Sequence, residues 1–292
     1  MGESRFIAAQ DGLRLHALEW GDRRSPLLPV VCLPGLTRTA EDFATLAAAL
    51  AADRRVLALD YRGRGRSDYD PNPEHYAIAV EAADVVTVLS GLAAAPAVVV
   101  GTSRGGLIAM TLAAAKPQLL AGVVLNDIGP VVEIEGMMRI KGYVGRLPQP
   151  ASYQEGAEML RRISGNQFPE LGAAEWLAAA NRGWRMEGGR LVTTYDPALA
   201  RTLDGVSADK PFPTMWPQFD AMAPLPLLVV HGANSDVLSA ATVAAMQARR
   251  PDMERLVVPD QGHAPLLAEP ATIRPIAAFA ARCDALRGRS RH

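Results

Sequence analysis

The sequence predicts an α/β protein built on a mostly parallel sheet, with helices on both faces and one long insertion. Three observations carry this prediction. Short apolar runs alternate along the chain with longer helical patterns, which is typical of a parallel sheet whose strands are joined by helices. Several of these runs are apolar throughout, as expected of strands covered on both faces. The alternation stops after residue 129 and resumes near residue 224.

Eight apolar runs are the predicted strands of this sheet. Asp11-Gly12 joins the first two and is a strong hairpin signal. The strands are expected at Arg5–Ala9, Leu13–Trp20, Leu28–Leu33, Arg55–Asp60, Ala95–Val100, Gly122–Asp127, Leu227–Val230 and Glu254–Val258. The helices are expected at Ala40–Ala52, Glu74–Leu92, Gly105–Ala115, Ala240–Arg249 and Ile273–Leu286.

The interruption predicts two units. We expect residues 1–129 and 224–292 to form the core, and residues 130–223 to form a mainly helical cap inserted between two strands. The interrupting stretch is helical in flavour but irregular, and it contains Trp176, Trp184 and Met137. Such residues suit the wall of an apolar pocket as well as an ordinary core.

Composition argues against several classes of partner. The 292 residues are 49% hydrophobic with a formal net charge of -1, so no extended basic face is expected to bind nucleic acid. The first residues lack the apolar stretch of a signal peptide, and no run of 18 apolar residues follows. Two cysteines do not support a disulfide framework. We expect a cytoplasmic protein that binds neither nucleic acid nor membrane, and nothing in the sequence predicts an oligomeric state.

One motif has a specific chemical meaning. The apolar run that ends at Val100 leads into Gly101-Thr102-Ser103-Arg104-Gly105 and then into a helical pattern. A G-x-S-x-G turn between strand and helix is a nucleophile elbow, in which the glycines make room for a strained turn that exposes the serine. A phosphate-binding P-loop is excluded because Leu107 follows Gly106 where that motif needs lysine.

A nucleophilic serine needs a base and a group that orients the base. His263 lies just after the last predicted strand, where its side chain can reach over the carboxyl edge of the sheet. We expect it to be the base. Asp236 follows the strand Leu227–Val230 and falls between the serine and the histidine in chain order, so we expect it to be the orienting acid. Asp127, at the end of the preceding strand, is the reserve candidate.

The oxyanion formed during acyl transfer needs two backbone donors. The N–H of Arg104, the residue after the serine, is the expected first donor, and the N–H of Leu36, in the loop Pro34-Gly35-Leu36-Thr37, is the expected second. We expect no metal and no cofactor, because the histidines and carboxylates show no metal-ligand spacing.

The order of these motifs resembles the α/β-hydrolase superfamily. The matching stretches cover nearly the whole chain outside the predicted cap, and they are Pro34-Gly35, Asp60 to Ser67, Gly101 to Gly106, Asn126 to Pro130, Asp236 and Gly262-His263. The resemblance implies the α/β-hydrolase fold and a structural role for the loop Arg62 to Ser67. Many relatives have His-Gly where this chain has Pro34-Gly35, so a side chain that often braces the oxyanion loop is absent.

The expected reaction is hydrolysis of a small-molecule ester or lactone through an acyl-enzyme on Ser103. Serine at the elbow argues against the similar haloalkane dehalogenases and epoxide hydrolases, which use a carboxylate nucleophile. Three alternatives stay open: hydrolysis of a carbon–carbon bond in ring-fission products, cofactor-free perhydrolase or haloperoxidase activity, and a non-catalytic small-molecule receptor.

Overall fold

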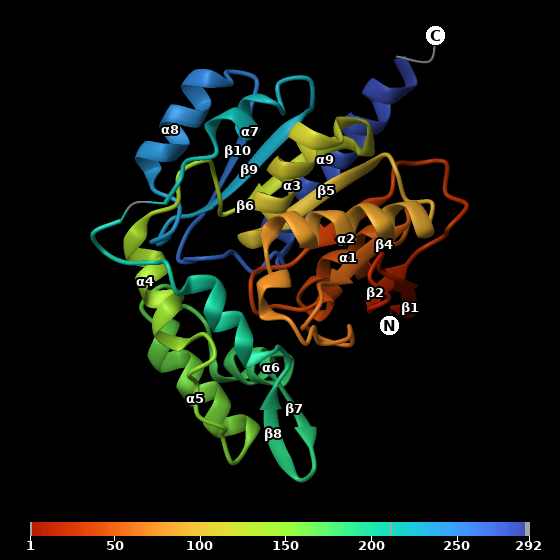
Figure 1. Cartoon of the computed structure of the whole chain (residues 1–292). Coiled ribbons are helices and arrows are strands. Elements are labelled where there is room, and N and C mark those ends of the chain that lie inside the picture. The colour runs from red at the N-terminus through yellow and green to blue at the C-terminus, as the bar shows by residue number, and fades with distance from the viewer. Residues whose placement is uncertain (1, 211, 290–292) are drawn as a thin grey trace.

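An eight-stranded sheet lies at the centre of the computed structural model, which describes residues 2–210 and 212–289 (Figure 1). The strand order is β1-β2-β4-β3-β5-β6-β9-β10. β2 pairs antiparallel with β1 and β4, and the remaining neighbours pair in parallel. The strands are β1 (Glu3–Ala8), β2 (Arg14–Trp20), β3 (Val30–Leu33), β4 (Val56–Asp60), β5 (Ala97–Thr102), β6 (Leu120–Asn126), β9 (Leu227–Gly232) and β10 (Glu254–Val258). This is the α/β-hydrolase fold that the sequence predicts.

Nine α-helices are present in the described part of the chain, some between consecutive strands, some in the long connection from β6 to β9, and one after β10. They are α1 (Ala44–Leu50), α2 (Ile78–Gly91), α3 (Arg104–Ala115), α4 (Ile134–Tyr143), α5 (Tyr153–Ser164), α6 (Ala173–Gly183), α7 (Trp216–Asp220), α8 (Ala240–Arg249) and α9 (Pro270–Arg289). Two predicted helices begin differently. A short 3₁₀ turn, Ala40–Phe43, precedes α1, and another, Pro73–His75, precedes α2. Among the described residues no helix is both long and apolar enough to cross a membrane.

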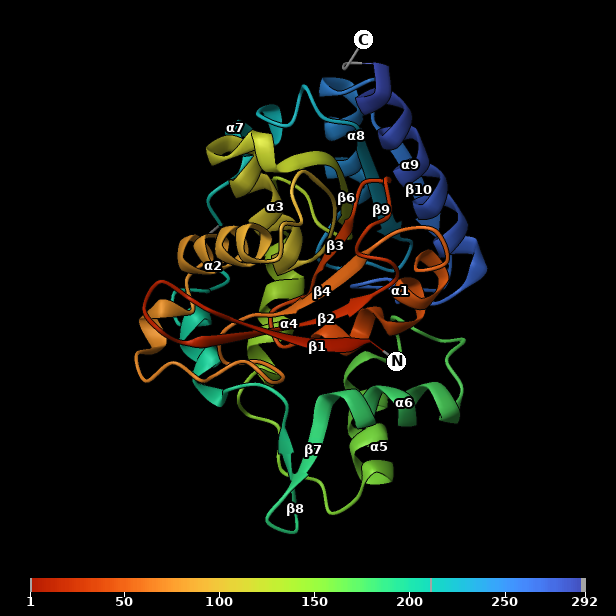
Figure 2. The ribbon, with the colours of Figure 1, turned by 90° about the vertical axis from the view of Figure 1, so that its right-hand side faces the viewer.

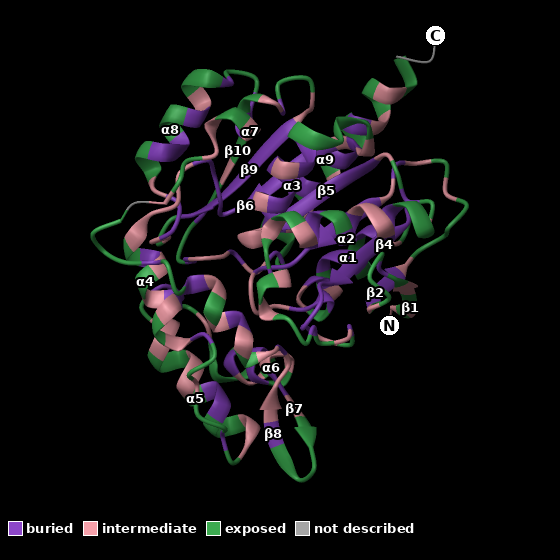
Figure 3. Cartoon of the chain, in the orientation of Figure 1, coloured by how far each residue is buried: buried purple, intermediate pink, exposed green. Residues whose placement is uncertain are grey.

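The central strands are buried on both faces because their successive side chains enter two different cores. Val99 of β5 packs in the core that contains apolar residues of α2 and α3. Val98 and Val100 pack in the opposite core, with residues of α1 and α9. Figure 2 shows these helix pairs on opposite sides of the sheet, and Figure 3 shows the strands between them as buried. The uninterrupted apolar runs in the sequence follow from this double cover.

The chain between β6 and β9 leaves the sheet, and we call residues 130–223 the inserted segment. Part of it has an apolar cluster of its own, which includes Phe168, Trp176 and Trp184. In Figure 1, α5, α6 and a small hairpin project beyond the edge of the sheet. The hairpin, β7 (Trp184–Glu187) with β8 (Arg190–Thr193), is an element that the sequence did not predict within this mainly helical segment. Gly188 and Gly189 between its strands both have positive φ, which a tight hairpin turn requires, and this pair is a sequence signal for the turn.

Candidate active site

The elbow is a tight turn between β5 and α3. Ser103 stands between the last residue of β5 and the first of α3, with φ at 50°, a left-handed conformation that is rare for serine. A Cβ on Gly105 would lie 2.1 Å from the carbonyl oxygen of Leu33, and one on Gly101 would lie 2.6 Å from the backbone of Gly105. Only glycine fits at these two positions, so the motif spacing has the steric reason that the sequence indicates.

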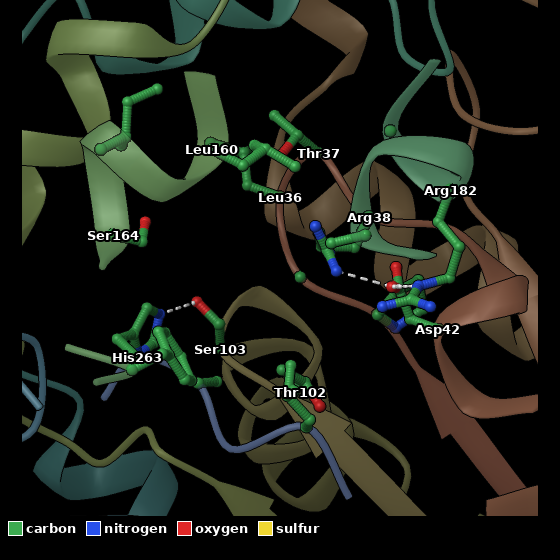
Figure 4. Close-up of a pocket in the computed structure, with 18 of the residues that line it drawn as sticks. Leu36, Thr37, Arg38, Asp42, Thr102, Ser103, Leu160, Ser164, Arg182 and His263 are labelled. Carbon is green, nitrogen blue, oxygen red and sulfur yellow. Dashed lines mark hydrogen bonds and ion pairs between the residues drawn. The ribbon is translucent and has the colours of Figure 1, made fainter. Parts of the chain in front are cut away.

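His263 reaches Ser103 from the loop that follows β10. Its Nε2 lies 2.8 Å from the Ser103 Oγ (Figure 4). Only 6% of the histidine side chain is exposed. The backbone N–H of His263 donates to the Oε1 of Gln167 at 3.0 Å, which ties the loop to the inserted segment. The two residues that the sequence singles out therefore meet at one point.

Asp127, not Asp236, contacts the other nitrogen of His263. The Asp127 Oδ2 lies 2.8 Å from the histidine Nδ1, and the carboxylate is fully buried. Two groups at the end of β9 and in the loop after it also donate to Asp127: the N–H of Gly232 to Oδ1 at 2.8 Å, and the hydroxyl of Ser235 to Oδ2 at 2.5 Å. A carboxylate beside Nδ1 favours the tautomer with its proton on that nitrogen, which leaves Nε2 as an acceptor for the serine hydroxyl.

The predicted position of Asp236 needs correction. Both of its carboxylate oxygens accept hydrogen bonds from the guanidinium of Arg139 on α4, at 2.6 and 2.9 Å. Burial opposes ionisation of Asp236, but hydrogen bonds from Arg139 and Gln167 outweigh burial and hold its pKa below the ordinary value of 3.8. Both oxygens of Asp236 are thus bound to Arg139, and the carboxylate beside His263 is that of Asp127, the reserve candidate.

The two predicted oxyanion donors belong to segments that share one buried ionic network. Arg64, which is fully buried, donates its Nε–H to the carbonyl oxygen of Leu36 at 2.8 Å. The Nη1 of Arg64 lies 2.6 Å from one oxygen of Glu81, and the other oxygen of Glu81 accepts from Arg104 at 2.5 Å. Arg64 thus braces the loop that has Pro34 where many relatives have histidine. The arginine comes from the loop Arg62 to Ser67, for which a structural role is expected.

A cavity of about 220 Å³ opens above Ser103 and His263. The sheet edge forms its floor, and the inserted segment supplies much of its wall through apolar residues such as Leu160, Phe168 and Trp176. The same cavity is also lined by charged residues, which are Arg38, Asp42, Arg139, Glu175 and Arg182. The site therefore combines the Ser103–His263 contact with a cavity that is lined by both apolar and charged side chains.

Comparison with known proteins assigns the family. A sequence model described as the alpha/beta hydrolase family matches residues 30–281. The chain is an α/β hydrolase. A solved structure of an alpha/beta hydrolase from Novosphingobium aromaticivorans agrees, with a TM-score of 0.89 and 42% identity over 96% of this chain and 98% of that one.

Two relatives of this α/β hydrolase carry named activities. A 3-hydroxybutyrate-oligomer hydrolase from Cupriavidus necator is 37% identical over 283 residues, which span 92% of this chain and 94% of the relative. A 2-(acetamidomethylene)succinate hydrolase from Mesorhizobium japonicum is 28% identical over 231 residues, 78% of this chain and 79% of the relative. Both relatives are hydrolases of this family.

Two residues that support the site of this α/β hydrolase, Gln167 and Arg64, were not predicted from the sequence. Gln167 lies in a stretch of the inserted segment without periodicity, and nothing in its neighbours marks it. Arg64 stands in a motif that the resemblance covers, yet its contact with Leu36 depends on how two loops distant in sequence meet. A Cβ on Gly262 would lie 2.4 Å from the side chain of Gln167, so the glycine before His263 is the only local trace of that contact.

Proposed function

We propose that this protein is a serine hydrolase of carboxylic esters, with Ser103 as nucleophile, His263 as general base and Asp127 as the acid that orients the histidine. One observation carries the proposal: two consecutive 2.8 Å contacts join the Ser103 Oγ, the His263 imidazole and the Asp127 carboxylate. Such a chain is the arrangement that activates a serine hydroxyl at neutral pH.

The reaction follows from this geometry. His263 takes the hydroxyl proton as the Ser103 Oγ attacks the ester carbonyl carbon. The backbone N–H groups of Leu36 and Arg104, the second at the positive end of α3, stabilise the oxyanion. The protonated imidazole then gives its proton to the departing alcohol oxygen. Water, deprotonated by the same histidine, attacks the acyl carbon, and the histidine then returns this proton to the Ser103 Oγ as the bond to the acyl group breaks and the acid is released.

The substrate we propose is a short oligoester of a hydroxy acid. The 3-hydroxybutyrate-oligomer hydrolase, similar over nearly the whole chain, supports this class. A cavity of about 220 Å³ suits a ligand of a few carbon units. Residues 130–223 then act as a cap, since the α5 and α6 side chains in the cavity wall hold the substrate against Ser103.

The test is hydrolysis of p-nitrophenyl esters from acetate to decanoate, together with the 3-hydroxybutyrate dimer, by wild type and Ser103→Ala. We expect turnover that peaks at short acyl chains and falls at least about 10⁴-fold in the variant. Ser90→Ala, which removes an exposed serine hydroxyl from α2, is the matched control and should retain wild-type rates.

Three results would contradict the proposal. Ester turnover that survives Ser103→Ala would exclude the serine as nucleophile. Absence of ester turnover, with hydrolysis of a ring-fission diketone or peracid formation instead, would replace the ester substrate with one of the alternative reactions. Ligand binding without turnover of any of these substrates would indicate a receptor.

A further inference from the structure

One wall of the cavity contains two guanidinium groups that share a single carboxylate oxygen. Arg38 donates from Nη2 to the Asp42 Oδ1 at 2.7 Å, and Arg182 donates from Nε to the same oxygen at 3.0 Å (Figure 4). The other oxygen of Asp42 accepts the backbone N–H of Thr39 at 3.1 Å. One negative charge therefore faces two positive charges.

The remaining guanidinium donors of Arg38 and Arg182 are available to a ligand. Within residues 2–210 and 212–289, neither guanidinium makes a hydrogen bond or ion pair other than that with Asp42. Their side chains are 36% and 30% exposed, and both line the cavity. Glu175 also lines the cavity, but in the described part of the chain it forms no ion pair with either arginine.

Arg139, the third arginine of the cavity wall, differs from these two because it is paired with a carboxylate of its own. It makes two hydrogen bonds to the two oxygens of Asp236, so its charge is matched one to one. The cluster of Arg38, Asp42 and Arg182 instead keeps one positive charge in excess. A planar guanidinium with free donors in a partly enclosed site is suited to bind a carboxylate.

The base of the Arg38 side chain lies close to Ser103. Gly35 lies between these two side chains, because a Cβ at this glycine would lie 3.3 Å from the Cγ of Arg38 and 3.7 Å from the Cβ of Ser103. In a 3-hydroxy acid unit, the ester oxygen and the carboxyl carbon are separated by two carbons, roughly 4 Å by ordinary bond lengths. The carboxylate on the alcohol half of the ester thus stays close to the scissile bond, and the arginine cluster lines the same cavity as Ser103.

We propose that Arg38 and Arg182 form a subsite for the free carboxylate of the substrate, carried on the alcohol half of the ester. This inference rests on the proposed esterase function and adds a specificity to it. The enzyme would then cleave the ester bond next to the carboxyl end of a short oligoester, and it would discriminate against neutral esters of the same size.

The test compares two substrates that differ only at the carboxyl end: the 3-hydroxybutyrate dimer as free acid and as methyl ester. We expect wild-type kcat/KM to be about ten-fold higher for the acid, since hydrogen bonds to charged groups are worth about that factor. Arg182→Gln should lower kcat/KM for the acid about ten-fold and leave the methyl ester within about two-fold, and Arg38→Gln should act in the same direction. Arg182→Lys, which keeps the charge, should restore part of the preference.

Arg185→Gln is the matched control. Arg185 lies on β7 of the same inserted segment and pairs with Glu187 at 3.0 Å, but it does not line the cavity. The control should keep the wild-type ratio of acid to ester. An equal loss on both substrates in Arg182→Gln, or no wild-type preference for the acid, would overturn the subsite.

The experiment separates failure of the subsite from failure of the proposed function. If p-nitrophenyl acetate is cleaved in a Ser103-dependent way while acid and methyl ester react equally, only the subsite is wrong. If no ester is cleaved, the carboxylate subsite can still be tested by measuring the binding of 3-hydroxybutyrate to Ser103→Ala by calorimetry. The added Arg182→Gln change should weaken that binding about ten-fold, and unchanged binding, or none in Ser103→Ala itself, would refute the subsite.

Discussion

The loops that follow β6 and β9 both place an aspartate near His263, yet the two carboxylates have different partners. Asp127 is fully buried and accepts hydrogen bonds from His263, Gly232 and Ser235. Asp236 is 19% exposed and accepts from Arg139 through both oxygens. The last residue of β9 and the loop after it thus supply donors to the aspartate that follows the neighbouring strand, while the aspartate of this loop pairs with Arg139 on α4.

Position in the chain therefore does not decide which of the two carboxylates contacts His263. Both aspartates lie between Ser103 and His263 in chain order, and both follow a buried strand. The choice depends on the neighbours. An arginine on α4 occupies one aspartate, whereas a backbone N–H and a serine hydroxyl hold the other toward the imidazole.

The largest expected effect is that of Asp127→Asn on activity. An amide cannot hold the Nδ1 proton as a carboxylate does, and it leaves the imidazole in the wrong tautomer, so we expect kcat/KM for ester hydrolysis to fall about 10⁴-fold. Asp236→Asn should lower it by less than about five-fold, because its carboxylate does not contact His263. Rate measurements on both variants, with circular dichroism to verify the fold, test this expectation. A larger loss of kcat/KM in Asp236→Asn than in Asp127→Asn would contradict it.

A smaller effect should follow loss of the support that the β9 loop gives to Asp127. Ser235→Ala removes the hydroxyl that lies 2.5 Å from the Asp127 Oδ2. We expect kcat to fall about ten-fold, since one hydrogen bond to a charged group is lost while the bond from Gly232 stays. Steady-state kinetics should show the loss in kcat rather than in KM, and a pure KM effect would indicate a role in substrate binding instead.

The smallest effect concerns stability and its dependence on pH. The Arg139–Asp236 pair is partly exposed, with side-chain exposures of 20% and 19%, so Asp236→Asn should lower the free energy of unfolding by about 1 kcal/mol at pH 7. Because the folded pKa of Asp236 lies below 3.8, this stabilisation is present above about pH 4 and is lost as the pH falls through the folded pKa.

Urea unfolding of wild type and Asp236→Asn at about pH 7 and pH 3 measures this difference. The gap between the two proteins should narrow at the lower pH. A gap that widens on acidification would mean that the pair does not hold the carboxylate in its ionised form.

Much of the fold was predictable because it depends on local sequence patterns. The buried strands are continuous apolar runs, and the elbow needs glycines at fixed spacing, so both can be recognised in the sequence without tertiary information. The hairpin β7–β8 was not predicted, since its strands are short and half exposed and only Gly188-Gly189 marks them. The partner of His263 could not be chosen, because Arg139 and Ser235 meet the two aspartates only after folding.

The central claim is that Asp127 holds the Nδ1 proton of His263, and proton NMR spectroscopy observes this proton directly. A short hydrogen bond to a buried carboxylate shifts an imidazole N–H resonance far downfield, and its absence in His263→Ala would assign it. We predict that the resonance is present in wild type and in Asp236→Asn and is lost in Asp127→Asn. A resonance that survives in Asp127→Asn and disappears in Asp236→Asn would contradict the account.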